Sequence, residues 1–196
     1  MGIKVTGPDG ATPVDPDEAR ALIPSHIATQ AELNEWEHDN IVEGEHWAFG
    51  RRRADVLRAE FLQLLHRKLF GATWRWAGQW RTTEKSIGIA PGRIAVAVTE
   101  LLQDVAAQLD AHSYPIREIA ARLHHRLVQI HPFPNGNGRL ARTYADLLLF
   151  VYGEPRFTWG DSDLVTAGNA RERYIAALRA ADDRDYEPLF EFLGVR

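Results

Sequence analysis

The segment LARTYADLLLFVYG, residues 140–153, constrains the fold more than any other part of this sequence. Its residues are typical of a helix, and apolar side chains occupy almost every face of that helix. A helix with this pattern is stable only when other elements cover it on all sides. We therefore expect a helical domain in which residues 140–153 form the central, buried helix.

Apolar residues recur at helical spacing along most of the chain. The clearest case is residues 53–71, where Leu57, Phe61 and Leu64 share one face and Gly71 is typical of a helix end. The same spacing predicts further helices over residues 15–24, 29–49, 98–109, 116–130, 162–183 (with Ser162 as cap) and 185–193. The predicted fold class is all-α.

Residues 72–96 depart from this pattern because they lack a helical period. Two short pieces of extended character, residues 86–90 and 93–96, flank a Pro91–Gly92 turn. Such a turn between extended pieces favours a small β-hairpin. We expect a hairpin or flap beside the helices.

Composition excludes several classes of protein. The chain of 196 residues contains no cysteine, which removes disulfides and thiolate metal sites. Its net charge of −4 argues against a general nucleic-acid binder, because such proteins usually carry a basic excess. The N-terminus has no secretory signal, and the longest strongly apolar run, residues 147–152, is far shorter than the roughly 20 residues that span a bilayer. We expect a cytoplasmic protein without membrane or direct nucleic-acid partners.

The stretch HPFPNGNGRLAR, residues 131–142, combines groups suited to binding an anion. Gly136, Asn137 and Gly138 precede the central helix, whose first backbone N–H groups have no partner within the helix. Glycines let these amides approach a ligand, so the loop is a candidate phosphate cradle. Arg139 and Arg142 lie three residues apart and project in similar directions, which suits a polyphosphate.

His131 precedes this loop, where a turn could direct its ring toward the anion. Near neutral pH an imidazole can take a proton from an attacking hydroxyl. Phe133 is the loop's only large apolar side chain and its expected anchor in the core. The alternative interpretation is a polar turn between two helices in which His131 is structural.

The twelve residues resemble the signature of Fic-domain proteins, His-x-Phe-x-(Asp or Glu)-Gly-Asn-Gly-Arg-x-x-Arg. The seven matching positions are His131, Phe133, Gly136, Asn137, Gly138, Arg139 and Arg142. The run FGATWRWAGQWRTTEKSIGI resembles the segment that leads into the family's flap, and ADDRDYEPLFEFL resembles the end of its core. The motif HPFPNGNGR most resembles the subgroup called mobile mystery protein B.

The resemblance covers roughly residues 55 to 193 and implies three parts of the chain. Residues 1–28 are expected to form an N-terminal arm, residues 29–54 an N-terminal helix that could be inhibitory, and residues 55–196 the Fic domain. The implied architecture is a Fic-fold helical bundle with a small β-hairpin flap. The subgroup also implies a setting on a mobile element, in a toxin–antitoxin-like pair.

The resemblance further implies transfer of AMP from ATP to a Tyr, Ser or Thr hydroxyl of an unknown target protein. His131 would be the general base, and Arg139 and Arg142 would hold the phosphates and stabilise the leaving group. The nucleotide-binding residues would be Asn135, Gly136, Asn137, Gly138, Arg139 and Arg142. The flap, Thr82 to Val96, would dock the target in extended form by strand addition. Its docking residues would be Thr82, Lys85, Ser86, Ile87 and Gly88.

Asn135 departs from the family pattern, in which an acid holds the Mg²⁺ that bridges the phosphates. Mg²⁺ prefers carboxylates, so Asn135 should hold it weakly, with the phosphates as the main ligands. Three outcomes remain open: a slow AMP transferase, a transferase with another donor or metal scheme, and a non-catalytic nucleotide-binding or interaction module. Gly138 argues against the branch of the family that transfers phosphate, because that branch carries a larger residue there.

A second feature concerns inhibition. Many Fic proteins carry a helix reading (Ser or Thr)-x-x-x-Glu-(Gly or Asn), whose Glu pairs with the second arginine of the signature. Asp39-x-x-x-Glu43-Gly44 has this spacing, with Asp in place of Ser or Thr. Glu43 is therefore a candidate inhibitory residue, and the alternative interpretation, which we favour, is a solvated acidic helix face. The sequence leaves open whether the chain forms a homo-oligomer.

Overall fold

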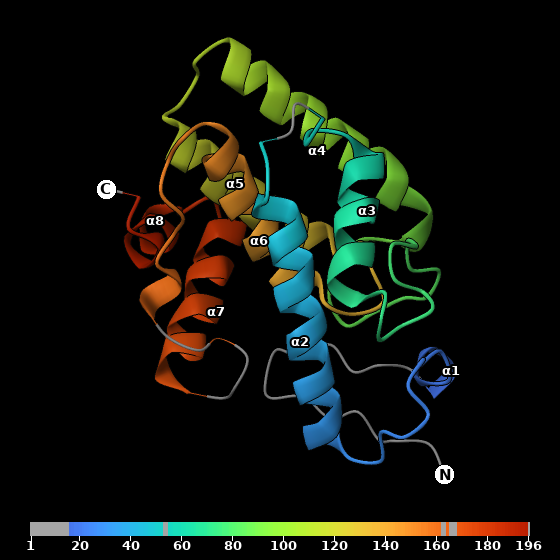
Figure 1. Cartoon of the computed structure of the whole chain (residues 1–196). Helices are drawn as coiled ribbons and strands as arrows, with labels where there is room; N and C mark the ends of the chain where they lie inside the picture. The colour runs from blue at the N-terminus through green and yellow to red at the C-terminus, as the bar shows by residue number, and fades with distance from the viewer. Residues whose placement is uncertain (1–15, 53–54, 162–163, 165–167, 196) are drawn as a thin grey trace.

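The computed structural model describes residues 16–52, 55–161, 164 and 168–195, and this part of the chain is helical (Figure 1). The α-helices are α1 (Pro16–Ala19), α2 (Gln30–Phe49), α3 (Ala59–Phe70), α4 (Ile94–Asp110), α5 (Ile116–Ile130), α6 (Asn137–Val151), α7 (Asn169–Asp182) and α8 (Glu187–Leu193). Short 3₁₀ turns occur at Pro91–Arg93 and Trp159–Asp161. The all-α prediction is confirmed, whereas the expected Ser162 cap lies outside the described residues.

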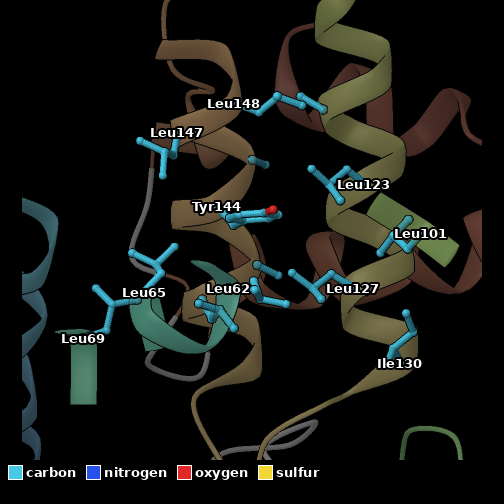
Figure 2. Packing of buried hydrophobic residues seen from close by; sticks show 14 of the residues in the cluster. Leu62, Leu65, Leu69, Leu101, Leu123, Leu127, Ile130, Tyr144, Leu147 and Leu148 are labelled. Carbon is cyan, nitrogen blue, oxygen red and sulfur yellow. The ribbon is translucent and has the colours of Figure 1, made fainter. Parts of the chain in front are cut away.

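Helix α6 is the buried centre that the sequence predicts. It packs against α5 along its length and also contacts α2 and α3. Figure 2 shows Tyr144 of α6 between Leu123 and Leu127 of α5, with Leu62 and Leu65 of α3 nearby. The Tyr144 hydroxyl donates to the Val56 carbonyl, so even this polar atom has a partner inside the core.

Helix α2 begins at a capping box. The Thr29 side chain accepts from the Glu32 amide at 3.2 Å, and the Glu32 carboxylate accepts from the Thr29 amide at 2.9 Å. Farther along, α2 lies directly on the end of α3. A Cβ on Gly44 would lie 2.7 Å from the Lys68 carbonyl oxygen, so the two backbones can approach this closely only at a glycine.

The expected β-hairpin is not formed. Within the described residues, 82–90 contain no strand, and 93–96 belong to the 3₁₀ turn and the first turn of α4. Pro91 has the fixed φ that favours a helix start, and Ile94 and Val98 bury one face of α4. The run RIAV is too short to show this helical period by itself, which is why its β-branched residues suggested a strand.

Helices α5 and α6 form an antiparallel pair joined by residues 131–136. The C-terminal end of α5 and the N-terminal end of α6 therefore meet at one end of the pair. This arrangement places the HPFPNGNGRLAR stretch there. Among the described helices, none is long and apolar enough to cross a membrane.

Candidate functional site

His131 lies at the turn that follows α5. Its backbone has the left-handed conformation, with φ 53° and ψ 60°, which is uncommon for a residue other than glycine. Its side chain is buried, and burial is the main cause that lowers its pKa from 6.5 to about 4. The positive charge of Arg81 lowers this pKa further, while hydrogen bonding to the Val128 main chain opposes the shift. At neutral pH the ring is therefore uncharged, the form that can accept a proton.

Phe133 anchors the loop as expected. Its side chain is fully buried, with its ring stacked on His66 at 3.8 Å and tilted against Trp80 at 4.9 Å between centroids. The side chain of Asn137 closes the loop by accepting from the Phe133 amide at 2.8 Å and donating to the Phe133 carbonyl at 2.7 Å. Asn137 thus shapes the cradle through its side chain.

Gly136 is the N-cap of α6 and has a positive φ of 78°. A Cβ at this position would lie 2.5 Å from the ring of Phe70, so both the conformation and the contact require glycine. The first bond of α6 runs from the Leu140 amide to the Gly136 carbonyl. The amides of residues 137–139 consequently have no acceptor within the helix, which makes this end suited to an anion.

Arg139 is held by an acid from a distant part of the chain. Its Nη1 lies 2.7 Å from Oε2 of Glu37, and its guanidinium lies over the Phe70 ring, 4.9 Å from the centroid. The other oxygen of Glu37 accepts from Trp74 Nε1 at 2.7 Å. Glu37 is buried, so this ion pair is largely removed from solvent.

Arg142 lies one helical turn farther along α6. Its Nη1 would be 3.7 Å from a Cβ on Gly138, which places the guanidinium beside the cradle. It forms a side-chain hydrogen bond with Tyr174 of α7, whose hydroxyl also bonds His124 Nε2 at 2.9 Å. Burial lowers the pKa of His124 to about 3, so the ring that bonds Tyr174 is uncharged at neutral pH. Arg142 is therefore held by Tyr174, whose own partner carries no charge.

His66 supports the loop from α3. Its Nδ1 accepts from the Gly78 amide at 2.9 Å, so Nε2 carries the hydrogen and donates to the Asn135 carbonyl at 3.1 Å. Burial lowers the pKa of His66 to about 3, which keeps this arrangement uncharged at neutral pH. The sequence offered one signal for this role, a histidine within the apolar face of residues 53–71.

Comparisons with known proteins agree with this geometry. Residues 56–149 match the model of the Fic/DOC family. These residues form a Fic/DOC family domain.

Relatives extend the likeness beyond the domain. The "Protein adenylyltransferase fic-1" of Caenorhabditis elegans is 32% identical over 145 residues, which is 71% of this chain and 27% of that protein. The chain thus spans about a quarter of the length of the curated relatives it matches. The N-terminal Fic domain of a VirB-translocated Bep effector from Bartonella quintana has a TM-score of 0.71 at 19% identity, covering 90% of each chain. The BepC protein of Bartonella tribocorum, solved with bound AMPPNP, has a TM-score of 0.71 at 18% identity, covering 91% of this chain and 96% of that one.

The Fic/DOC domain offers little for a dedicated metal site at Asn135. The Asn135 Oδ1 accepts from the Gly136 amide at 2.5 Å, and an amide oxygen carries no charge. Among the described residues, no three His, Asp or Glu side chains group in a way that could hold an ion. Asp146, the nearest acid along α6, is buried and accepts from the Phe157 amide and Trp159 Nε1 instead. The residues present therefore do not fit a carboxylate-held Mg²⁺.

The candidate inhibitory residue Glu43 lies on α2 with its side chain exposed. On the same helix, Glu37 is the acid that contacts a signature arginine, and it contacts the first one, Arg139. Sequence reasoning missed Glu37 because it lies outside the inhibitory spacing. No local signal distinguishes it from the neighbouring acids of α2.

The candidate docking residues of the Fic/DOC domain lie in an irregular loop that passes over His131. A Cβ on Gly88 would be 2.7 Å from His131 Cβ, so the loop contacts the histidine directly. Ile87 is 42% exposed, and Thr82 and Ser86 are also exposed. Lys85 differs from them, because its Nζ is paired with Glu18 of α1 at 2.6 Å and its side chain is buried.

Proposed function

We propose that this Fic/DOC domain is a protein adenylyltransferase, which transfers AMP from ATP to a hydroxyl group of a protein. The observation that supports this best is the uncharged His131 at the same end of the α5–α6 pair as the cradle and its two arginines. A binding site requires only the cradle, whereas a transferase also requires a base. Relatives named protein adenylyltransferases and a Fic structure with bound AMPPNP favour the same activity.

In this proposal His131 accepts the proton of a Tyr, Ser or Thr hydroxyl of the target. The freed oxygen attacks the α-phosphorus of ATP and forms a new P–O bond. The bond from the α-phosphorus to the bridging oxygen breaks, and pyrophosphate leaves with that electron pair. The amides of residues 137–139, with Arg139 and Arg142, stabilise the charge on the phosphates.

We propose that Mg²⁺ is carried by the nucleotide phosphates, with Asn135 as a neutral ligand at most. An ion held in this way depends on the nucleotide for its charge partners. We further propose that the protein belongs to the mobile mystery protein B subgroup, which the motif HPFPNGNGR supports. We also propose a toxin–antitoxin-like setting and a cytoplasmic location.

The second candidate function is a nucleotide-binding or interaction module without turnover. Two observations favour it: the neutral Asn135, and the Glu37 carboxylate on Arg139, where phosphate would bind. A donor other than ATP is compatible with the same observations.

A transfer assay separates these functions. The purified chain is incubated with cell lysate, Mg²⁺ and ATP labelled at either the α- or the γ-phosphate. His131→Ala is compared with His38→Ala, which removes an exposed histidine of α2. AMP transfer predicts protein-bound label from α-labelled ATP only, lost in His131→Ala and retained in His38→Ala. Label from γ-labelled ATP only would indicate phosphate transfer, and nucleotide binding without label would support the binding module.

A further inference from the structure

Arg81 is a buried arginine that the proposed chemistry does not use. It is 2% exposed, and its guanidinium donates to main-chain carbonyls. Nε donates to His131 at 2.6 Å, Nη1 donates to Thr83 at 2.8 Å, and Nη2 donates to Ile89. Two of these carbonyls, those of Thr83 and Ile89, lie at the two ends of residues 83–89, which we call the docking loop because they include most of the candidate docking residues. The third carbonyl belongs to the proposed base.

These bonds explain how His131 keeps an unfavourable backbone conformation. A non-glycine residue with φ 53° persists only where its surroundings hold it. Arg81 holds two consecutive main-chain carbonyls at this turn, those of His131 and Pro132. Its side chain donates to the His131 carbonyl, and its amide donates to the Pro132 carbonyl at 2.9 Å.

The docking loop and the base share this support. A Cβ on Gly88 would lie 2.6 Å from Nη2 of Arg81 and 2.7 Å from Cβ of His131. The Ile89 amide also donates to the Ile130 carbonyl at 3.4 Å. A shift of the guanidinium would therefore displace the loop and the histidine together.

We propose that Arg81 is a positioning residue that holds His131 and the docking loop in one arrangement, so that transfer to a protein target depends on Arg81 while nucleotide binding does not. This inference rests on the proposed function of the site. The cradle, residues 136–138, has separate supports in Phe70, His66 and Asn137. Loss of Arg81 should leave these supports in place.

The test compares Arg81→Met with Arg117→Met. Arg117 also donates to two main-chain carbonyls, those of Pro155 and Gly194, but away from this site. For Arg81→Met we expect a fall in kcat of about 100-fold, the scale of a small misplacement of a reacting group, and a nucleotide Kd within about twofold of the parent. Arg117→Met should retain both values. Equal losses of kcat and nucleotide binding in Arg81→Met, or an unchanged kcat, would overturn the proposal.

Gly88→Ala provides a second variant in case Arg81→Met does not fold. It adds a methyl group against Arg81 and His131 and retains the guanidinium, and we expect the same split between kcat and nucleotide Kd.

NMR titration of the His131 ring tests positioning without any activity, so an inactive parent would not obscure the result. The charges that act on this ring are Arg81 and Lys85, the latter paired with Glu18. Gly88→Ala is the variant for this measurement, because it retains the charge of Arg81 while its methyl group displaces the guanidinium and the ring. In Gly88→Ala the ring pKa should rise from about 4 toward 6.5, and in Arg117→Met it should stay. An unchanged pKa in Gly88→Ala would show that this arrangement does not position the base, whereas a raised pKa in Gly88→Ala together with an inactive parent would refute only the proposed function.

Discussion

Glu37 and Arg139 lie 102 residues apart in the sequence and meet as an ion pair at 2.7 Å. The pair joins α2 to the first turn of α6, at the point where a bound polyphosphate would need the guanidinium. A carboxylate at this position competes with phosphate for the same donors. If the cradle binds nucleotide as proposed, we expect helix α2 to limit its affinity.

Glu37→Gln should raise the affinity for ATP about fivefold, which corresponds to ~1 kcal/mol, because the competing charge is removed. The Gln side chain retains an oxygen that can accept from Trp74 Nε1. Calorimetric titration of ATP and Mg²⁺ into the parent and the variant measures the change.

Glu43→Gln is the matched control, because it removes one negative charge from an exposed position of the same helix. It should leave the ATP affinity unchanged. If Glu43→Gln raised the affinity and Glu37→Gln did not, the inhibitory residue would be the one that the sequence spacing indicates.

The pH dependence of transfer should report the environment of His131. Burial lowers its pKa from 6.5 to about 4, and the base must be uncharged to accept a proton. The rate should therefore be constant from pH 8 to about 6 and decline only as the pH approaches about 4, whereas an ordinary histidine would lose half its activity near pH 6.5. Single-turnover rates at saturating nucleotide, with the nucleotide Kd measured at each pH, would show this. A midpoint near pH 6.5 would contradict the buried environment of the ring.

Gly136→Ala should destabilise the fold by about 2–4 kcal/mol, since it combines a positive φ with a methyl group pressed into Phe70. Urea unfolding measures this change. Gly138→Ala is the comparison, because its Cβ would meet only Arg142, at an ordinary 3.7 Å. We expect Gly138→Ala to change stability by less than about 1 kcal/mol but to weaken nucleotide binding, since the methyl group enters the cradle. Equal destabilisation by the two variants would refute the assigned contact with Phe70.

The helices could be predicted because their signals are local. The all-round apolar pattern of residues 140–153 predicted the buried α6, and Gly71 marked the end of α3. The run at residues 93–96 was misinterpreted, because four residues cannot distinguish a strand from the start of a helix. Only its packing in α4 against the core decides the question.

The contacts that support the site could not be predicted in the same way. Glu37, His66 and Arg81 act on residues 50 to 102 positions away, and nothing near them in the sequence indicates a partner. Arg81 does belong to the run FGATWRWAGQWRTTEKSIGI, which resembles the segment leading into the family's flap, but that run does not show that its guanidinium binds the His131 carbonyl. Such contacts follow from the packing of α2, α3 and the loop around α6.

Asn135→Asp should increase Mg²⁺-dependent transfer, because it introduces a carboxylate beside the cradle where the described residues supply only an amide oxygen. An aspartate retains an oxygen that can accept from the Gly136 amide, and His66 Nε2 donates to the main-chain carbonyl of residue 135, which the substitution does not change, so the loop should keep its shape. The measurement is the transfer rate as a function of Mg²⁺ concentration at fixed ATP, with Asn135→Ala as the control that removes the side-chain oxygen altogether.

We expect half-maximal activity at a Mg²⁺ concentration at least about fivefold lower in Asn135→Asp than in the parent, as one added charge near a divalent ion would give. Parent and Asn135→Asp curves that coincide would show that the phosphates alone hold the ion and that the charge of residue 135 does not limit the rate.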